Sequence, residues 1–267
     1  VVRRTSRQDL NMHWYDKDGN PKHWVTSKNG TKRGTTLRDA RKLDLVPSVT
    51  SVLDIMAKPG LDRWKINKAI EASLSLRRGE FEHDDSLSKR ILQESKREAE
   101  EASQRGVRIH DLLESFFKTG NIPGNEEDKA IIRSVQTLLH VNCGEQDWIS
   151  EETFAHPDGY GGMIDLHCKE TPDESAAWVI DFKTKEFDAG AKNLAYESMG
   201  YQLAAYREGL GYGQFARIAN VFISATNPGI SIFHEWSGED HDRFSHIFKH
   251  SLELWKYTKK YWPEIKI

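Results

Sequence analysis

Apolar residues recur every three or four positions through much of the chain, which is the spacing of helices with one buried face. The first such segment begins at a cap on Ser48 or Thr50, runs to about residue 56, and ends at Pro59 and Gly60. Further helices are predicted over residues 61–74, 86–120, 127–139 and 191–210, and from Ser237, whose helix places Phe244, Phe248, Leu252 and Trp255 on one face.

Runs rich in β-branched and aromatic residues lie between these helices and predict strands. Residues 161–166 and 178–184 flank a turn-like segment, residues 171–175, so this pair predicts a β-hairpin. The remaining strands are expected at residues 12–15, 23–26, 148–155, 215–225 and 230–236.

The two N-terminal strands flank a turn-like sequence, residues 16–21, which predicts an N-terminal β-ribbon. Helices flanking a mixed central sheet make the expected fold class α/β.

The most informative feature of the chain is a set of charged residues on the predicted hairpin. Side chains two apart in a strand share a face, so Asp181 and Lys183 point one way, and Ile180 and Phe182 point into a core. If the strands pair about the turn centre, Asp165 lies near Asp181. Two carboxylates and a lysine on an apolar hairpin are costly unless something uses them, and a hard divalent cation would do so.

Two glycines precede the first of these acids. Gly161 and Gly162 permit a close backbone approach, as a phosphate-bearing ligand would need. With them, the spacing from Asp165 to the Asp181-Phe182-Lys183 run resembles the core motif of the PD-(D/E)xK nuclease superfamily.

Three further segments extend this resemblance in matching order. Gly106, His110 and Glu114 resemble a helical motif of RecB-type members, and Gln202 with Tyr206 resembles their Gln-x-x-x-Tyr motif. Residues 47–53 followed by residues 61–65 are similar to the opening of the mitochondrial genome maintenance exonuclease and its phage relatives.

The resemblance implies a PD-(D/E)xK core in residues 47–267, with a helical insertion at about 61–140 and a basic extension at 1–46. It implies a Mg²⁺- or Mn²⁺-dependent deoxyribonuclease that hydrolyses phosphodiester bonds. The catalytic residues implied are Asp165, Asp181, Lys183, His110, Gln202 and Tyr206. The implied metal ligands are Asp165, Asp181, the Phe182 carbonyl, His110 and an upstream acid.

Two residues are alternatives for that upstream acid. If Phe154 faces the core, Glu152 shares its face and Glu151 takes the other, which favours Glu151. Glu114, one helical turn beyond His110, is a candidate to orient the imidazole.

Residues for binding DNA are expected beside the catalytic run and on the insertion. Thr184 and Lys185 directly follow the catalytic lysine, and Lys185 is the foremost phosphate candidate. Arg63, Trp64 and Lys65 begin the insertion, and Trp14, Tyr15, Trp24 and Trp64 are candidates for stacking on unpaired bases.

Amino-acid composition excludes some classes of protein but does not identify the function. Hydrophobic content is 37% and charged content 30%, and no apolar run approaches the length of about 20 residues that spans a bilayer. The net charge is −3, while residues 1–46 hold eleven Lys and Arg against five Asp and Glu. Cys143 and Cys168 are too few for a four-cysteine iron–sulfur cluster and predict buried thiols in a reducing compartment.

The leading interpretation is an exonuclease acting on free single-stranded DNA ends in recombination, repair or replication, with phage proteins as possible partners. It would act in the cytoplasm, or in mitochondria if an upstream transit peptide was removed. Two alternatives stay open: a structure-specific endonuclease with the same site, and a catalytically silent protein that binds DNA ends.

Overall fold

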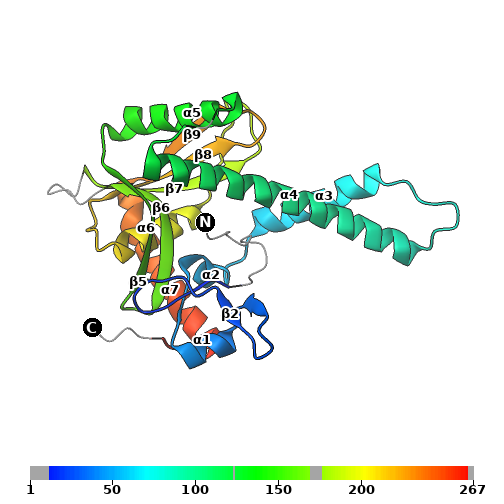
Figure 1. Cartoon of the computed structure of the whole chain (residues 1–267), viewed down its shortest axis with the longest axis horizontal. Coiled ribbons are helices and arrows are strands. Elements are labelled where there is room, and N and C mark those ends of the chain that lie inside the picture. Colours follow the sequence, from blue (N-terminus) through cyan, green and yellow to red (C-terminus); the bar gives the residue numbers. More distant parts are fainter. Residues whose placement is uncertain (1–11, 123, 169–175, 264–267) are drawn as a thin grey trace.

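A five-stranded mixed sheet forms the centre of the computed structural model, which describes residues 12–122, 124–168 and 176–263 (Figure 1). Neighbouring strands are antiparallel except for one central parallel pair, β7 and β8, which α6 (Glu197–Gly209) connects. The α/β class is therefore confirmed. The strands in sheet order are β5 (Trp148–His156), β6 (Tyr160–Cys168), β7 (Trp178–Lys185), β8 (Arg217–Ser224) and β9 (Ser231–Glu235).

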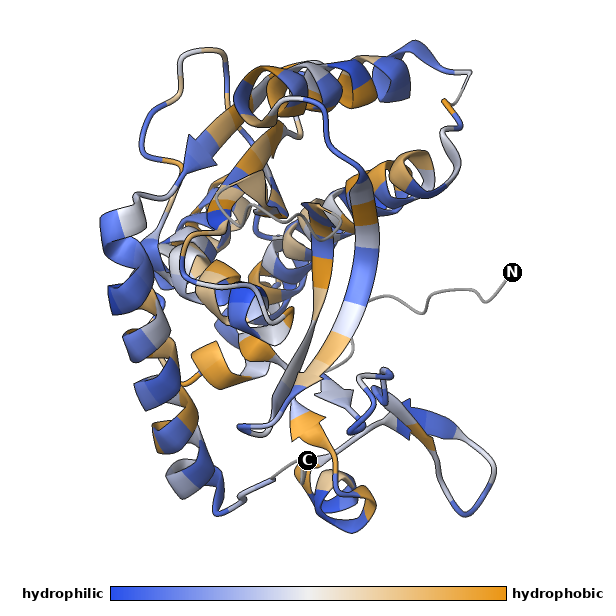
Figure 2. Cartoon of the chain, turned by 90° about the vertical axis from the view of Figure 1, so that its left-hand side faces the viewer, coloured by the Kyte–Doolittle hydropathy of each residue, from blue (hydrophilic) through white to orange (hydrophobic). Residues whose placement is uncertain are grey.

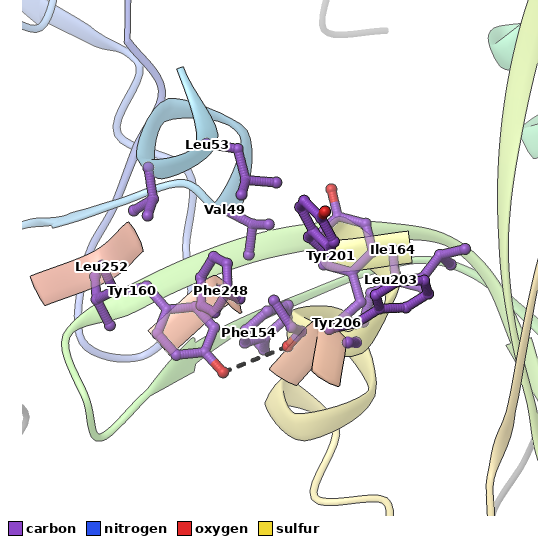
Figure 3. Packing of buried hydrophobic residues seen from close by; sticks show 14 of the residues in the cluster. Val49, Leu53, Phe154, Tyr160, Ile164, Tyr201, Leu203, Tyr206, Phe248 and Leu252 are labelled. Atoms are coloured by element: carbon purple, nitrogen blue, oxygen red, sulfur yellow. Dashed lines mark hydrogen bonds between the residues drawn. The ribbon is translucent and has the colours of Figure 1, made fainter. Parts of the chain in front are cut away.

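Two hydrophobic cores lie on opposite faces of this sheet. The first packs the sheet against α2 (Val49–Leu53), α6 and α7 (Gly238–Lys259), and Figure 3 shows its side chains converging. The second packs it against α5 (Glu126–Cys143) and the C-terminal part of α4 (Asp84–Thr119). The helices mix hydrophilic and hydrophobic residues along their length (Figure 2), as expected of helices with one buried face.

The alternation of β7 between these cores is as predicted. Ile180 and Phe182 enter the second core, while Val179 enters the first. Asp181 and Lys183 share the face of Val179, which α6 covers. The strand thus presents its two charged side chains to one helix. The turn expected at residues 171–175 lies outside the described residues.

An arm of two helices projects from the body of the protein (Figure 1). It consists of α3 (Pro59–Ser75) and the first part of α4, and Lys68 Nζ lies 3.5 Å from Glu98 Oε2 between them. Ala72 is the one buried residue of α3. The arm therefore adds little to either core.

The predicted N-terminal ribbon forms only next to its turn, where Tyr15 makes an antiparallel bridge with Pro21 and the Lys22 N–H donates to the Trp14 carbonyl at 2.8 Å. Beyond that bridge, the predicted pairing is wrong. β1 (Trp14–Tyr15) pairs with β4 (Val46–Pro47), and β2 (Trp24–Thr26) pairs instead with β3 (Lys32–Gly34). Burial explains the exchange, because Trp14 is fully buried, lies against the ring of Trp255 at 6.1 Å, and donates its indole N–H to the Thr35 carbonyl at 3.1 Å. Trp14 and Tyr15 are both buried and so are unavailable for stacking on bases.

Helix boundaries depart from the predictions in three places. Pro59 begins α3 rather than ending the helix before it, because proline suits the first helical position. α6 begins later than residue 191, since Gly190 and Asn193 have φ values of 88° and 58° that interrupt a right-handed helix. A short helix, α1 (Leu37–Leu43), was not predicted, although Thr36 caps it.

Other boundaries agree closely with the predictions. Ser48 caps α2 by accepting from the Ser51 N–H, and Ser237 caps α7. Gly120 ends α4 in a left-handed conformation with φ 68°. Cys143 and Cys168 are buried free thiols, as predicted. Within the described ranges, no helix combines the length and the apolar character needed to cross a bilayer.

Candidate active site

The candidate site lies where β6 and β7 separate. Their pairing runs through Val179 opposite His167 and Ile180 opposite Leu166, so Asp165 and Asp181 occupy the next position. There the Asp165 carboxylate replaces a ladder bond, because its Oδ2 accepts the N–H of Phe182 at 2.8 Å. The two acids are therefore brought together as the hairpin predicts.

Asp181 is 3% exposed and is held by three side chains. Lys183 Nζ lies 2.9 Å from Oδ1 and 2.6 Å from Oδ2. Gln202 Nε2 donates to Oδ1 at 3.0 Å, and Asn220 Nδ2 donates to Oδ2 at 2.7 Å. Both oxygens thus have a cation and an amide as partners, which favours the ionised carboxylate.

Gln202 and Tyr206 reach this cluster from α6, one helical turn apart. Gln202 Oε1 accepts from Lys183 Nζ at 3.2 Å, and its Nε2 also donates to the Tyr206 hydroxyl at 2.8 Å. The Tyr206 ring packs edge-on to Phe154 in the first core (Figure 3). The core therefore anchors the amide that positions the lysine.

Burial dominates the electrostatics of the site. It raises the pKa of Asp181 above its ordinary value, the negative charge of Asp165 adds to this rise, and the positive charge of Lys183 opposes it. Burial also raises the pKa of Tyr206 well above its usual range, so the phenol stays protonated. The site thus concentrates negative charge, and the positive charge of Lys183 offsets part of it.

His110 approaches the site from α4. Its Nδ1 lies 3.4 Å from Asp165 Oδ1, and its ring lies edge-on to Phe182 with centroids 6.2 Å apart. Glu114, one turn further on, accepts from Lys118 at 2.8 Å. The structure therefore places His110 beside the first carboxylate of the cluster.

The two upstream acids have different surroundings. Glu152 Oε2 lies 2.7 Å from Nε2 of the buried His167. Glu151 falls between two paired positions of β5 and β6 and so stands opposite Asp165, with a φ of 59° that is rare in a strand. Irregular backbone of this kind often marks functional sites.

The strand that carries Asp165 also changes its facing there. Ile164 enters the first core and Leu166 the second, although residues two apart ordinarily share a face. The irregular conformation of Glu151 lies directly across from this change. Together they turn Asp165 toward the separation between β6 and β7.

Neighbouring residues of the protein, rather than a ligand, fill the space beside Gly161 and Gly162. A Cβ on Gly161 would lie 2.7 Å from the Phe154 carbonyl oxygen. A Cβ on Gly162 would lie 2.8 Å from the rings of both Phe154 and Tyr206. The glycines therefore serve the packing of the site, which corrects the expectation of a ligand at this point.

The predicted DNA-binding residues fall into two groups. Thr184 lies next to Gly106 of α4, at the root of the arm, and its Oγ1 is buried without a hydrogen-bond partner among the described residues. Lys185 donates to the Leu194 carbonyl, and its Nζ lies 4.3 Å from the ring centroid of Tyr196. On the arm, Arg63 and Lys65 are exposed and Trp64 is half-buried.

The donor set at the separation fits a cation that is shared with a substrate. Among the residues that the structure describes, no three His, Cys, Asp or Glu side chains form a metal-binding group. Two carboxylates are present, and the Phe182 carbonyl faces the same side as its N–H, toward Asp165. Mg²⁺ is commonly held by one or two carboxylates together with waters and substrate phosphates, which matches this set.

Asn220 and Trp236 belong to the cluster and were not predicted from the sequence. Asn220 is fully buried on β8 opposite Asp181, and its Oδ1 accepts the Trp236 indole N–H at 2.9 Å. A signal was present, because Asn220 is a single amide inside an apolar run. Its partner could not be inferred, since the register of β7 and β8 is set by the folded sheet.

Comparisons with known proteins do not identify a family or a function for this chain. No family model and no curated protein matches the chain. Thirteen solved chains match it, among them the crystal structure of SSO0001, with a TM-score of 0.29 and 14% identity over 72% of this chain and 86% of that one. An overlap this weak carries no argument about function.

Proposed function

We propose that this protein is a metal-dependent DNA exonuclease of the PD-(D/E)xK type that prefers free single-stranded ends. The proposal rests chiefly on one observation. Asp165, Asp181 and Lys183 meet where two central strands separate, with Lys183 within 2.9 Å of a carboxylate and 3.2 Å of Gln202. A surface hairpin with solvated charges would not bury both acids.

Asp165, Asp181 and the Phe182 carbonyl would hold a Mg²⁺ or Mn²⁺ ion, with His110 and Glu151 as further candidates. When bound, such an ion neutralises the scissile phosphate and lowers the pKa of a bound water. Phosphodiester hydrolysis needs on the order of 20 kcal/mol of catalysis, more than side chains ordinarily supply alone.

The protein's own residues position the reacting groups. Lys183 is a compact charge with three donors, and its Nζ contacts both Asp181 oxygens and Gln202. A donor that Asp181 releases when a cation binds can orient the attacking water and offset charge that develops on the phosphate. Gln202 and Tyr206 fix the lysine, because both are anchored to α6 and the first core.

The arm supplies a surface for the strand. Arg105 of α4 pairs with Glu186 at 2.8 Å, and Gly106 packs against Thr184, so the arm is rooted beside the site. Arg63 and Lys65 are exposed on α3, where they can meet phosphates, and Trp64 can stack on a base. A strand end would then pass along the arm to reach Lys183.

The test is degradation of end-labelled linear single-stranded DNA, with linear duplex and circular single strands alongside, in Mg²⁺ and in EDTA. We expect Mg²⁺-dependent loss of the linear single strand while circles are spared. Lys183→Ala should be inactive, and Lys249→Ala, which changes a half-exposed lysine on α7, should match the wild type.

Two other results would support the alternative functions. Cleavage of circles at the rate of linear strands would replace the exonuclease with an endonuclease. Binding of DNA ends in EDTA, with no turnover in Mg²⁺ or Mn²⁺ on any substrate, would overturn catalysis in favour of an end-binding protein.

A further inference from the structure

Asn220 is an amide with no exposure, set in the apolar strand β8. It stands opposite Asp181 in the parallel register, and its Nδ2 donates to Asp181 Oδ2 at 2.7 Å. A buried amide without hydrogen-bond partners would destabilise the folded protein strongly. Leucine or valine would fill a purely structural position in this strand more cheaply, so the amide points to a role in holding the carboxylate.

Trp236 fixes which end of the amide faces the acid. The indole N–H can only donate, and it lies 2.9 Å from Asn220 Oδ1. The NH₂ group is thereby left for Asp181. The Trp236 ring is itself held, edge-on to Phe244 with centroids 5.1 Å apart. The orientation of Asn220 therefore follows from its surroundings.

The partners of Asp181 differ in how freely they can move. Lys183 contacts both oxygens, and its side chain is 26% exposed on a flexible stem. Asn220 and Gln202 each hold one oxygen from a regular element, a strand and a helix. A divalent cation arriving at Asp181 repels the ammonium, whereas the two amides have no charge and can stay in place.

We propose that Asn220 is a positioning residue that, backed by Trp236, holds Asp181 in its orientation when a divalent cation displaces Lys183. This rests on the proposed function in requiring that Asp181 binds a cation. Without the Asn220 donor, Oδ2 has no amide on its buried side, and the carboxylate turns away from the position that the cation needs. Cation affinity should fall while DNA affinity is kept.

The test measures Mn²⁺ binding to the full-length chain directly, by electron paramagnetic resonance of free Mn²⁺, without DNA. Asn220→Leu removes the donor at similar volume, and Trp236→Phe keeps the ring but releases the amide. We expect Asn220→Leu to weaken Mn²⁺ binding about 10- to 100-fold, the range for loss of a residue that orients a metal ligand. Trp236→Phe should weaken it about 2- to 10-fold, as for one lost hydrogen bond.

Ser251→Ala is the matched control, because Ser251 is a buried polar residue of α7 that bonds the Ile247 carbonyl away from the site. It should bind Mn²⁺ like the wild type, and all variants should keep the wild-type KM for linear single-stranded DNA. If Asn220→Leu does not fold, Trp236→Phe decides the matter by the same measurement.

The outcomes separate this inference from the proposed function. If the wild type binds Mn²⁺ and the folded Asn220 and Trp236 variants bind it with the same affinity, the positioning role is overturned and the proposed nuclease function is not. Mn²⁺ binding weakened as expected, with no DNA cleavage by the wild type, would support the positioning role and overturn the nuclease. A wild-type chain that binds no Mn²⁺ would overturn the positioning role, and it would overturn the nuclease as well if it also cleaved no DNA in Mg²⁺ or Mn²⁺.

Discussion

At the scale of single residues, the site is a balance between burial and charge. Asp181 is buried beside a second carboxylate, and both circumstances raise its pKa. Lys183 offsets this by lying within 2.9 Å of it, and two amides complete its hydrogen bonds. Asp165 contributes the second negative charge to this balance, so removing that charge is the most direct way to shift it.

Asp165→Asn should separate activity from stability. The asparagine Oδ1 can still accept the Phe182 N–H, so the strands keep their geometry. The charge that raises the pKa of Asp181 is removed, so the melting temperature should be equal to or above that of the wild type. Cleavage should fall about 100-fold or more, as for loss of a group that stabilises the transition state. A variant that melts earlier, or that cleaves normally, would contradict this account.

Lys185 gives a prediction for pH. Burial, with the positive charge of Lys183, lowers the pKa of Lys185 to about 8 from 10.5. Between these values the unfolded chain binds a proton that the folded protein releases, so this residue makes the free energy of unfolding rise with pH. Lys185→Met should show a smaller rise than the wild type in urea denaturation at about pH 7.5 and about pH 9.5. Lys249→Met, on α7, should follow the wild type; equal slopes in all three proteins would refute the effect.

The sequence predicts the shared face of Asp181 and Lys183, because strand alternation is a local property. It also places Gln202 and Tyr206 one turn apart, since helical spacing is local too. It does not reveal Asn220, because a parallel neighbour is joined through α6 and its register is set by packing. Local periodicity thus identified most of the cluster, and its non-local members, Asn220 and Trp236, were missed.

At the scale of helices and strands, local sequence signals again predict correctly, and features that depend on distant residues are again missed. The long helix α4, its end at Gly120 and the cap of α7 follow from local signals. Beyond the bridge of Tyr15 and Pro21, the N-terminal strands were mispaired because Trp14 packs against Trp255, more than 200 positions away in the chain. The start of α6 was misplaced since only the fold reveals the left-handed conformations of Gly190 and Asn193.

Packing of α6 on β6 leads to a prediction about stability. A Cβ at Gly162 would lie 2.8 Å from the rings of Phe154 and Tyr206, so Gly162→Ala must displace one of them. The free energy of unfolding should fall by about 1–3 kcal/mol, the usual cost of overpacking. Cleavage should fall as well, because Tyr206 holds Gln202. Gly238→Ala, where a Cβ meets open space, is the control in urea denaturation, and equal stability of the two variants would argue against this packing.

At the scale of the whole molecule, the arm is structurally separate from the body. Both cores lie in the body, and the buried residues of α4, Ile109 and Leu113, belong to its second core. The arm projects beyond them (Figure 1), and its Gly106 lies next to Thr184, beside the site. It can therefore be shortened without removing a residue of either core, and Ala72 is the one buried residue of α3 that is lost.

Shortening the arm should change which DNA is cleaved rather than whether it is cleaved. Lys68 and Glu98 face each other at 3.5 Å, so a short glycine–serine linker can replace residues 69–97 between them. If the arm admits only strand ends, the shortened protein should degrade circular single strands that the wild type spares, and linear strands should still be degraded. Leu74→Ser, which changes an exposed side chain of the full-length arm, is the control and should still spare circles. Circles that stay intact while the shortened protein degrades linear strands normally would show that the requirement for an end arises in the body, at the site itself.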